Sequence, residues 1–410
     1  KMKDSGIEWI GEIPEGWEVV PVKRLCTMQA GKNLTSEQIA PEGTYPVYGG
    51  NGIRGFFSDY NCDGQFLTVG RQGALCGNVH KINGKVWATE HAVITTPSSY
   101  TILDFLYYLL IGMDLNQYVS STAAQPGLAV GTLLNLKTCY PCSTLEQTQI
   151  SNYLNTKCSE IDVMLTKTRS SIEEYKKLKQ AVITQAVTKG VRGKREMKDS
   201  GNPWFGQIPA DWKLTRVGLH FSIILGKMLC NAPLNDTYTL EPYYCAADVH
   251  FDGVADGERK KMWFSPIEKD LYRVSVGDLL VVEGGAGAGG SAIVENQDSD
   301  TYIQNSIMIV RSKGNADNRY LRYLLEFLVK QGYIDIVCNK ATIPHFTKDK
   351  LSCVPFCLCP TGEQKEIADH LDAKCAEIDG LIAKKEQLVK ELESYKKSLI
   401  YEVVTGKREV

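Results

Sequence analysis

Two segments of the chain carry apolar residues at alternating steps of four and three positions, the spacing of a coiled-coil seam. The first lies within residues 145–189 and the second near the end of the chain. Each pattern predicts a helix of about 45 residues, roughly 65 Å long. The predicted seam residues are Leu154, Cys158, Ile161, Leu165 and Ile172 in the first segment, and Leu371, Cys375, Ile378, Ile382, Val389 and Leu392 in the second.

Residues typical of helix ends flank both segments. Thr144 and Thr361 stand where an N-cap is expected, and Gly190 and Gly406 stand where each helix should stop. A long helix with a single apolar stripe needs a partner to cover that stripe. We expect the two helices to pack antiparallel against each other.

The chain contains an internal repeat, with matching segments both inside and outside these helices. At an offset of 195 residues, Lys3–Gly6 returns as Lys198–Gly201. At an offset of 217, Glu146-Gln147 returns as Glu363-Gln364. Further matches are Gly11 with Gly206, Ile13 with Ile208, Pro14 with Pro209, Trp17 with Trp212, Gly31-Lys32 with Gly226-Lys227, and Glu160–Asp162 with Glu377–Asp379.

The repeat also joins the two ends of the chain. Gly193–Glu196 returns as Gly406–Glu409, and in the middle of the chain this motif runs directly into the Lys-Asp-Ser-Gly motif. The pattern is that of a two-unit cycle cut at one junction. It predicts pseudo-twofold symmetry and chain termini that lie close together.

Two dissimilar segments separate the repeated parts, and we call residues 18–143 the first module and residues 213–359 the second. Both show short β-strand patterns with Gly, Asn and Asp between them, and one short amphipathic helix each, at Ile102–Ile111 and Arg319–Lys330. We expect an α+β fold with two globular domains joined by the helices. The expected divisions are 1–143, 144–190, 191–359 and 360–410.

Composition narrows the choice of protein class. The 410 residues carry 46 Lys+Arg and 48 Asp+Glu, for a net charge of −2. The longest apolar run, Phe105–Met113, is far shorter than the ~20 residues that span a bilayer. No signal-peptide pattern opens the chain. Thirteen cysteines without a regular framework indicate reduced thiols. We therefore expect a cytoplasmic protein with no membrane contact.

Candidate catalytic and cofactor motifs are weak. Gly285, Gly287 and Gly290 form a G-x-G-x-x-G pattern, but no helix pattern follows, so a loop between strands is favoured over a dinucleotide site. Cys139 and Cys142, and a second cysteine group at 353–359, lack zinc-ligand spacing, so buried apolar thiols are favoured over a metal site. We expect no catalytic residues, metal or cofactor in this chain.

Side chains that hydrogen-bond bases and phosphates do occur in Gly-rich loops. Basic residues also cluster within residues 167–195. That cluster is as typical of a solvated helix face as of a DNA-binding surface. The predicted DNA-binding residues are Lys32, Asn51, Arg54, Arg71, Gln72 and Asn78 in the first module, and Lys227, Arg259, Lys260, Lys261, Gln304 and Asn305 in the second.

Over nearly its whole length the chain resembles the specificity subunits of type I restriction-modification enzymes. The resemblance rests on the repeated Lys-Asp-Ser-Gly motif with its Ile-Pro and Trp, on Leu145–Gln147 and Gly362–Gln364, and on Ala186–Gly190. Tyr45–Ile53 and Gly70–Gly73 also look like part of a target-recognition domain of that family.

The resemblance implies a non-catalytic DNA-recognition subunit. Each module would read one half of a bipartite site in double-stranded DNA, and the long helices would set the gap between the halves. The helices would also dock two methyltransferase subunits, in a complex with two restriction and translocation subunits. S-adenosylmethionine, ATP and magnesium would be bound by those partners. Two alternatives stay open, namely a DNA-acting enzyme with its own target domain and a coiled-coil scaffold that never contacts DNA.

Overall fold

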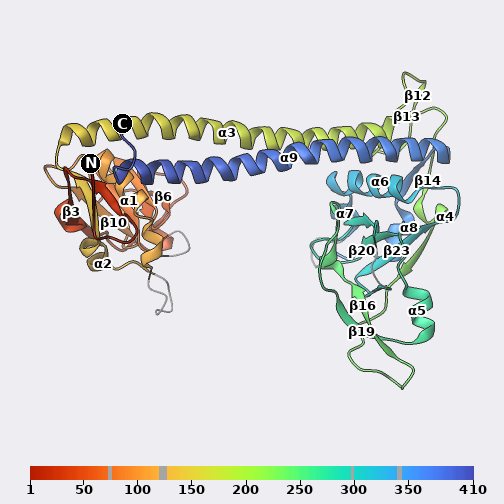
Figure 1. Ribbon diagram of the computed structural model, residues 1–410. Helices are drawn as coiled ribbons and strands as arrows, with labels where there is room; N and C mark the ends of the chain where they lie inside the picture. The colour runs from red at the N-terminus through yellow and green to blue at the C-terminus, as the bar shows by residue number, and fades with distance from the viewer. Residues whose placement is uncertain (73–75, 120–126, 297–299, 339–343) are drawn as a thin grey trace. The chain divides into compact units, whose positions relative to one another are not determined.

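The computed structural model describes residues 1–72, 76–119, 127–296, 300–338 and 344–410. They divide into two compact units. The first unit is Lys1–Ser170 with Lys385–Val410, and the second is Ser171–Lys384. Helices α3 (Thr144–Lys189) and α9 (Thr361–Val404) each contribute a segment to both units (Figure 1). The predicted α+β fold with two long helices is confirmed.

The ends of the long helices differ from the prediction in one respect. Thr144 and Thr361 are the first residues of the helices, so their prediction as N-caps is wrong. Ser143 stands one position earlier, and its hydroxyl accepts a hydrogen bond from the Glu146 amide at 3.4 Å. The predicted stops are correct, since Gly190 (φ +75°) and Gly406 (φ +71°) follow the helices in the left-handed conformation that glycine favours.

The helices pair antiparallel within each unit. In the first unit Asp162 accepts hydrogen bonds from Lys396 (2.6 Å), and Arg169 pairs with Glu393. In the second unit Lys179 donates to Asp379 (2.7 Å), and Arg192 pairs with Glu366 (2.8 Å). In both units the partner's number falls as the number along α3 rises. The Asp162–Lys396 and Lys179–Asp379 pairs are also related to each other by the repeat offset of 217.

The first unit contains two two-stranded sheets (β1-β2 and β11-β3), a four-stranded sheet in the order β4-β10-β7-β8 and a three-stranded sheet in the order β6-β5-β9. Helix α1 packs against the four-stranded sheet. The strands are β1 (Met2–Asp4), β2 (Glu12–Pro14), β3 (Trp17–Pro21), β4 (Cys26–Ala30), β5 (Tyr45–Gly49), β6 (Gly52–Phe57), β7 (Gln65–Gly70), β8 (Val79–Asn83), β9 (Trp87–Ala88), β10 (Ala92–Pro97) and β11 (Lys137–Pro141), and the short helices are α1 (Leu103–Gly112) and α2 (Val130–Asn135).

The second unit repeats the topology of the four-stranded and three-stranded sheets and adds a two-stranded sheet, β17-β18. Its four-stranded sheet has the order β15-β23-β20-β21 and its three-stranded sheet the order β19-β16-β22. The strands are β12 (Met197–Asp199), β13 (Gln207–Pro209), β14 (Lys213–Arg216), β15 (Phe221–Leu225), β16 (Thr239–Tyr244), β17 (Val249–His250), β18 (Gly253–Val254), β19 (Lys260–Phe264), β20 (Leu279–Val282), β21 (Ser291–Ile293), β22 (Tyr302–Ile303), β23 (Ile307–Ser312) and β24 (Pro355–Leu358), and the short helices are α4 (Val217–His220), α5 (Pro266–Tyr272), α6 (Asn318–Lys330), α7 (Tyr333–Val337) and α8 (Lys348–Cys353).

The correspondence extends to strand direction. β5 pairs antiparallel with β6 and parallel with β9, and β16 pairs antiparallel with β19 and parallel with β22. The two modules, which are dissimilar in sequence, therefore share one topology. Alternating buried positions and backbone pairing can be met by many sequences, so topology persists where sequence does not.

A buried glutamine fastens each short helix to a long one. Gln147 accepts a hydrogen bond from the amide of Ile102, the N-cap of α1, at 2.8 Å. Gln364 accepts one from the amide of Asp317, the N-cap of α6, at 2.9 Å. Both glutamines are fully buried. The repeated Glu-Gln motif therefore sets the position of each module's helix against the long helices.

Burial of the seam varies along the helices. Leu154, Cys158, Ile161, Leu165, Ile172, Leu371, Cys375 and Ile378 are buried, and Ile382, Val389 and Leu392 are partly buried. The first and last segments of the chain also meet, because the Tyr401 hydroxyl donates to the Trp9 carbonyl at 2.8 Å. The predicted proximity of the termini is thus confirmed within the first unit.

All thirteen cysteines are unpaired. Burial raises the pKa of the Cys139 thiol to about 12 and that of Cys357 to about 12. Both thiols lie in hydrophobic clusters and act there as small apolar groups. No helix of the described residues is long and apolar enough to cross a membrane.

Candidate nucleic-acid interface

Three connections meet at one end of the first module: the β5–β6 turn, the β7–β8 connection and the β9–β10 turn. The Arg71 amide donates to the His91 carbonyl at 2.9 Å, and the Thr89 amide donates to the Tyr48 carbonyl at 2.9 Å. Asn78 donates through its side chain to Asn51 at 3.0 Å. We call this set of turns the first rim.

The six residues predicted for the first module all lie on or beside this rim. The Lys32 amide donates to Ala88 at 3.0 Å, which seats Lys32 beside β9. The Arg54 side chain lies across Gly49, at the end of β5. Gln72 forms an isolated bridge with Gly127. Lys32, Asn51, Arg54 and Asn78 are exposed, and Arg71 and Gln72 are partly buried.

The second module builds an equivalent rim with the same backbone hydrogen bonds. The Glu283 amide donates to Ser306 at 2.8 Å, as Arg71 does to His91. The Gln304 amide donates to Tyr244 at 3.1 Å, as Thr89 does to Tyr48. The Lys227 amide donates to Ile303 at 3.1 Å, as Lys32 does to Ala88. We call these turns, including the loop that joins β20 to β21, the second rim.

The residues predicted for the second module are less available than those of the first. Glu268 pairs with the Lys227 ammonium, and Asp248 accepts from Arg259 at 3.3 Å. The side chains of Lys227 and Arg259 are only 10% and 16% exposed. Burial raises the pKa of Glu268, but hydrogen bonds from Lys227 and Ser265 outweigh it and hold that pKa below its usual value.

The four other predicted residues of the second module divide into two groups. Lys260 and Lys261 are exposed on β19. Gln304 donates to Asn305 at 2.7 Å, and both are partly buried at the β22–β23 turn. The structure therefore places Gln304 and Asn305 on the second rim, and Lys260 and Lys261 on the adjoining strand. Their role in DNA binding stays a prediction.

The Gly-rich run lies in the loop between β20 and β21, and no helix follows it. The predicted loop between strands is confirmed, and the helix that a dinucleotide fingerprint requires is not formed there. Gly285 (φ +87°) and Gly289 (φ +83°) adopt conformations that favour glycine. Among the described residues, no group of three or more His, Cys, Asp or Glu side chains could hold a metal ion.

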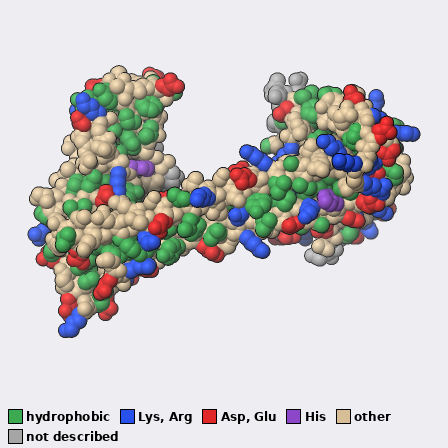
Figure 2. Space-filling model, turned by 90° about the horizontal axis from the view of Figure 1, so that it is seen from above, with side chains coloured by type: hydrophobic (Ala, Val, Ile, Leu, Met, Phe, Trp, Pro, Cys, Tyr) green, Lys and Arg blue, Asp and Glu red, His purple; other side chains and the backbone are tan. Residues whose placement is uncertain are grey.

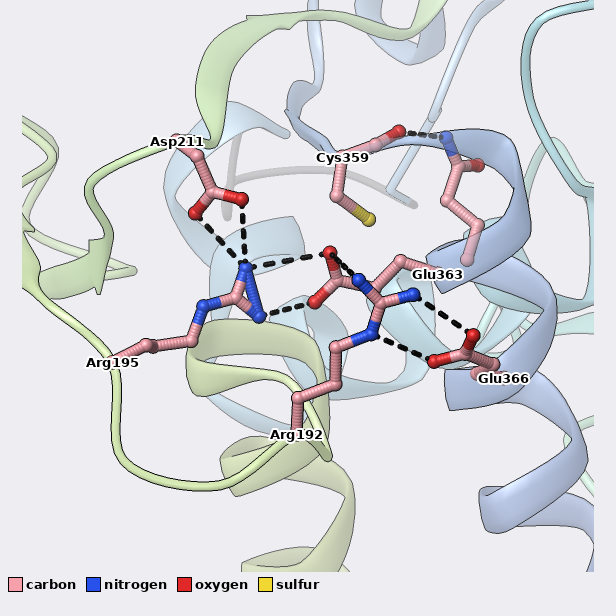
Figure 3. Close-up of polar contacts among 7 residues, drawn as sticks. Arg192, Arg195, Asp211, Cys359, Glu363 and Glu366 are labelled. Carbon is pink, nitrogen blue, oxygen red and sulfur yellow. Dashed lines mark hydrogen bonds and ion pairs between the residues drawn. The ribbon is translucent and has the colours of Figure 1, made fainter.

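A joint of charged residues fastens the start of α9 to the segment that follows α3 (Figure 3). Glu363 is fully buried, and Arg195 binds both of its carboxylate oxygens. Arg195 also donates to Asp211 at 2.9 Å, and Arg192 donates to Glu366 at 2.8 Å. The buried carboxylate is thus compensated by a guanidinium on a neighbouring segment.

At the equivalent place in the first unit, which we call the first joint, one hydrogen bond holds the glutamate. The Trp17 indole donates to Glu146 at 2.9 Å, and Glu146 is partly buried. Its counterpart Trp212 is buried, and its indole nitrogen has no partner among the described residues. The repeated Trp and Glu therefore occupy equivalent places, but a hydrogen bond joins them in the first unit only, as far as the described residues show.

The long helices show mixed charge along the face seen in Figure 2, where Lys and Arg are interspersed with Asp and Glu. Within the basic group of residues 167–195, Arg169, Lys179, Arg192 and Arg195 are held by carboxylates of α9. In the first unit, an open groove of about 1140 Å³ lies between α1 and the long helices. The four ion pairs therefore use part of the basic group to join α3 and the segment after it to α9.

Glu283 is a rim residue that the set of predicted DNA-binding residues does not include. His345 lies 3.3 Å from a carboxylate oxygen of Glu283 and belongs to an isolated bridge with Gly284. The signal for Glu283 is its position directly after an apolar strand, which is also the position of Arg71. His345 lies far along the chain, and only the backbone pairing brings it to the rim.

Comparisons with known proteins agree with this geometry. The family model described as "Type I restriction modification DNA specificity domain" matches residues 14–174 and 255–391. The type I restriction enzyme EcoprrI specificity subunit of Escherichia coli is 45% identical over 121 residues, which span 28% of this chain and 30% of that relative. The putative type I restriction enzyme MjaX specificity subunit of Methanocaldococcus jannaschii is 27% identical over 97% of this chain and 95% of its own length.

Solved structures show the same fold. A structure described as showing complex assembly and conformational transition of the type I R-M system aligns with a TM-score of 0.72, at 15% identity, over 97% of this chain and 99% of that one. The HsdS subunit of Thermoanaerobacter tengcongensis aligns with a TM-score of 0.53, at 16% identity, over 97% of this chain and 98% of that one.

Proposed function

Because the chain belongs to the family of type I restriction-modification specificity subunits, we propose that it selects the DNA on which such a complex acts. Each module reads one half of a bipartite, asymmetric site in double-stranded DNA. The observation that carries the proposal is that the two rims share one backbone skeleton and present different side chains. Readers of two unlike half-sites need such a common frame with variable contacts.

The long helices hold the two modules and determine the spacer between the half-sites. In this proposal they also dock two methyltransferase subunits, and two restriction and translocation subunits complete the complex. Chemistry resides in those partners, which bind S-adenosylmethionine, ATP and magnesium. This chain contributes no catalytic group. The thirteen unpaired cysteines fit a reducing, cytoplasmic location.

Module exchange tests the proposal. The full chain is co-expressed with its methyltransferase subunits, and methylated bases are mapped across the host genome. Replacing residues 18–143 with the corresponding module of another family member should change one half of the site and leave the other half and the spacer intact. An unchanged methylation pattern would contradict the proposal.

Two measurements separate this function from the alternatives. Methyl transfer by the isolated chain would instead indicate an enzyme with its own target domain. A coiled-coil scaffold would show no duplex binding at any salt concentration. The proposed DNA reader binds duplexes, and its affinity falls steeply as salt rises, because phosphate contacts release counterions.

A further inference from the structure

Glu283 occupies the position in the second rim that Arg71 occupies in the first. The equivalence is fixed by four backbone hydrogen bonds. The amides of Arg71 and Glu283 donate to His91 and Ser306, and their carbonyls accept from Leu128 and Phe346. The residues just before them also match. The Gly70 amide donates to the Asn78 carbonyl, and the Val282 amide donates to the Gly290 carbonyl, both at 2.8 Å.

The side chains at this shared position have opposite charge. Arg71 forms no side-chain ion pair or hydrogen bond with the described residues. The Glu283 side chain is 17% exposed, and one of its oxygens lies 3.3 Å from His345, whose side chain is 61% exposed. The other carboxylate oxygen of Glu283 has no partner within the described residues. Within the described part of the chain, this acceptor of the second rim is therefore unoccupied.

The loop beside Glu283 leaves room for close approach. Gly284, Gly285, Ala286 and Gly287 carry no side chain larger than a methyl group, and Ala286 and Gly287 are exposed. A Cβ at Gly285 would meet no atom within 4 Å. Side chains of this loop therefore do not obstruct the approach of a large ligand to the carboxylate.

A carboxylate next to DNA is repelled by the phosphates, so it contributes to binding only when a donor on the DNA meets it. In the major groove, the donor that Glu characteristically accepts from is the N4 amino group of cytosine, whereas Arg donates to guanine O6 and N7. Resting on the function proposed above, we propose that Glu283 specifies a cytosine in the second half-site by accepting a hydrogen bond from its N4 amino group. Arg71 makes the equivalent contact to a guanine in the first half-site.

The test uses the full chain in complex with its methyltransferase subunits and genome-wide mapping of methylated bases. Glu283→Gln keeps the size of the side chain and supplies the donor–acceptor pair that suits adenine. We expect the preference for cytosine to fall about 5- to 150-fold at one position of the second half-site, in favour of adenine, with the first half-site unchanged. Arg71→Gln should change one position of the first half-site only.

Glu196→Gln is the matched control, because Glu196 is exposed and its carboxylate contacts none of the described residues. It removes the same charge from the same unit and should leave the site unchanged. A Glu283→Gln site identical to that of the original chain would overturn the proposal. So would a uniform loss of methylation with no change in the site, because that result indicates a structural role.

A DNA-side measurement avoids any effect of substitution on folding. Placing N4-methylcytosine at the assigned position blocks the amino hydrogen that faces the major groove. The unmodified complex should bind this duplex about 5- to 150-fold more weakly than the parent duplex, and the same modification in the spacer should have no effect. Equal affinity for both duplexes would contradict the role of Glu283. If exchange of residues 213–359 also fails to alter the site, the proposed function itself is wrong.

Discussion

The first and second modules differ in sequence along most of their length, yet they share strand order, strand direction and the backbone hydrogen bonds of their rims. What differs is the side chain at equivalent positions, such as Arg71 against Glu283. Outside the modules, by contrast, Gln147 and Gln364 are identical, and each accepts a hydrogen bond from the N-cap amide of a short helix. The comparison indicates that the frame keeps the glutamine contact in both units, whereas equivalent rim positions carry side chains of opposite charge.

The largest contrast is expected at the two joints. Glu363→Gln removes the buried carboxylate charge and leaves Asp211 as the only carboxylate paired with Arg195. We expect a loss of about 3–5 kcal/mol in the free energy of unfolding, measured by denaturant titration of the full chain.

The matched change Glu146→Gln keeps an oxygen that can accept from Trp17 and removes only the charge, so it should cost no more than about 1 kcal/mol. Equal losses for the two variants would show that the buried charge cluster of the second joint adds nothing beyond the simpler first joint.

The two buried glutamines should behave alike. Gln147→Ala and Gln364→Ala each remove the acceptor of one N-cap amide, that of Ile102 or Asp317, at a cost of about 1–3 kcal/mol. Unfolding measurements should give losses that agree within about 1 kcal/mol, because both residues also donate to a nearby carbonyl, that of Pro141 or Cys359. Gln147 additionally donates to Tyr100, so its loss should be the larger one. A much larger loss for one of them would break the equivalence of the two units.

Lys32 and Lys227 are matched by the repeat but differ in environment. Lys32 is exposed, and Glu268 pairs with Lys227. Lys32→Ala should weaken duplex binding at all sequences and lower the salt slope by about 1. Lys227→Ala should lower stability and leave the salt slope unchanged. Salt titrations of duplex binding by the assembled complex distinguish these outcomes, and identical slopes for both variants would show that Lys32 contacts no phosphate.

Acid should affect the first module through Asp104. Burial raises the pKa of Asp104, but hydrogen bonds from Lys81 and Asn155 outweigh burial and hold it below the ordinary value of 3.8. A lowered folded-state pKa stabilises the fold above pH 3.8, and the contribution is lost as pH falls through the folded-state pKa. Asp104→Asn should therefore be less stable than the original chain at pH 7 and match it near pH 2. A deficit that persists in acid would exclude ionisation as its cause.

The sequence predicts the frame well because its signals are periodic and repeated. The seam spacing and the terminal glycines locate α3 and α9 to within a residue or two. The rims are harder, because strands as short as β9 and β22 carry little pattern. His345 reaches Glu283 only through a bridge between segments distant in sequence, and the pairing of Lys227 with Glu268 depends on the placement of α5. Residue type alone therefore predicts DNA contact for Lys227, whereas in the fold this lysine pairs with Glu268.

The most direct test of the shared frame is a chain that carries the first module twice, with residues 213–359 replaced by residues 18–143. Co-expressed with the methyltransferase subunits, it should methylate sites that contain two copies of the half-site read by the first module, and genome-wide mapping of methylated bases would reveal them. Continued methylation of the original asymmetric site would contradict the claim that each module reads its own half of the DNA.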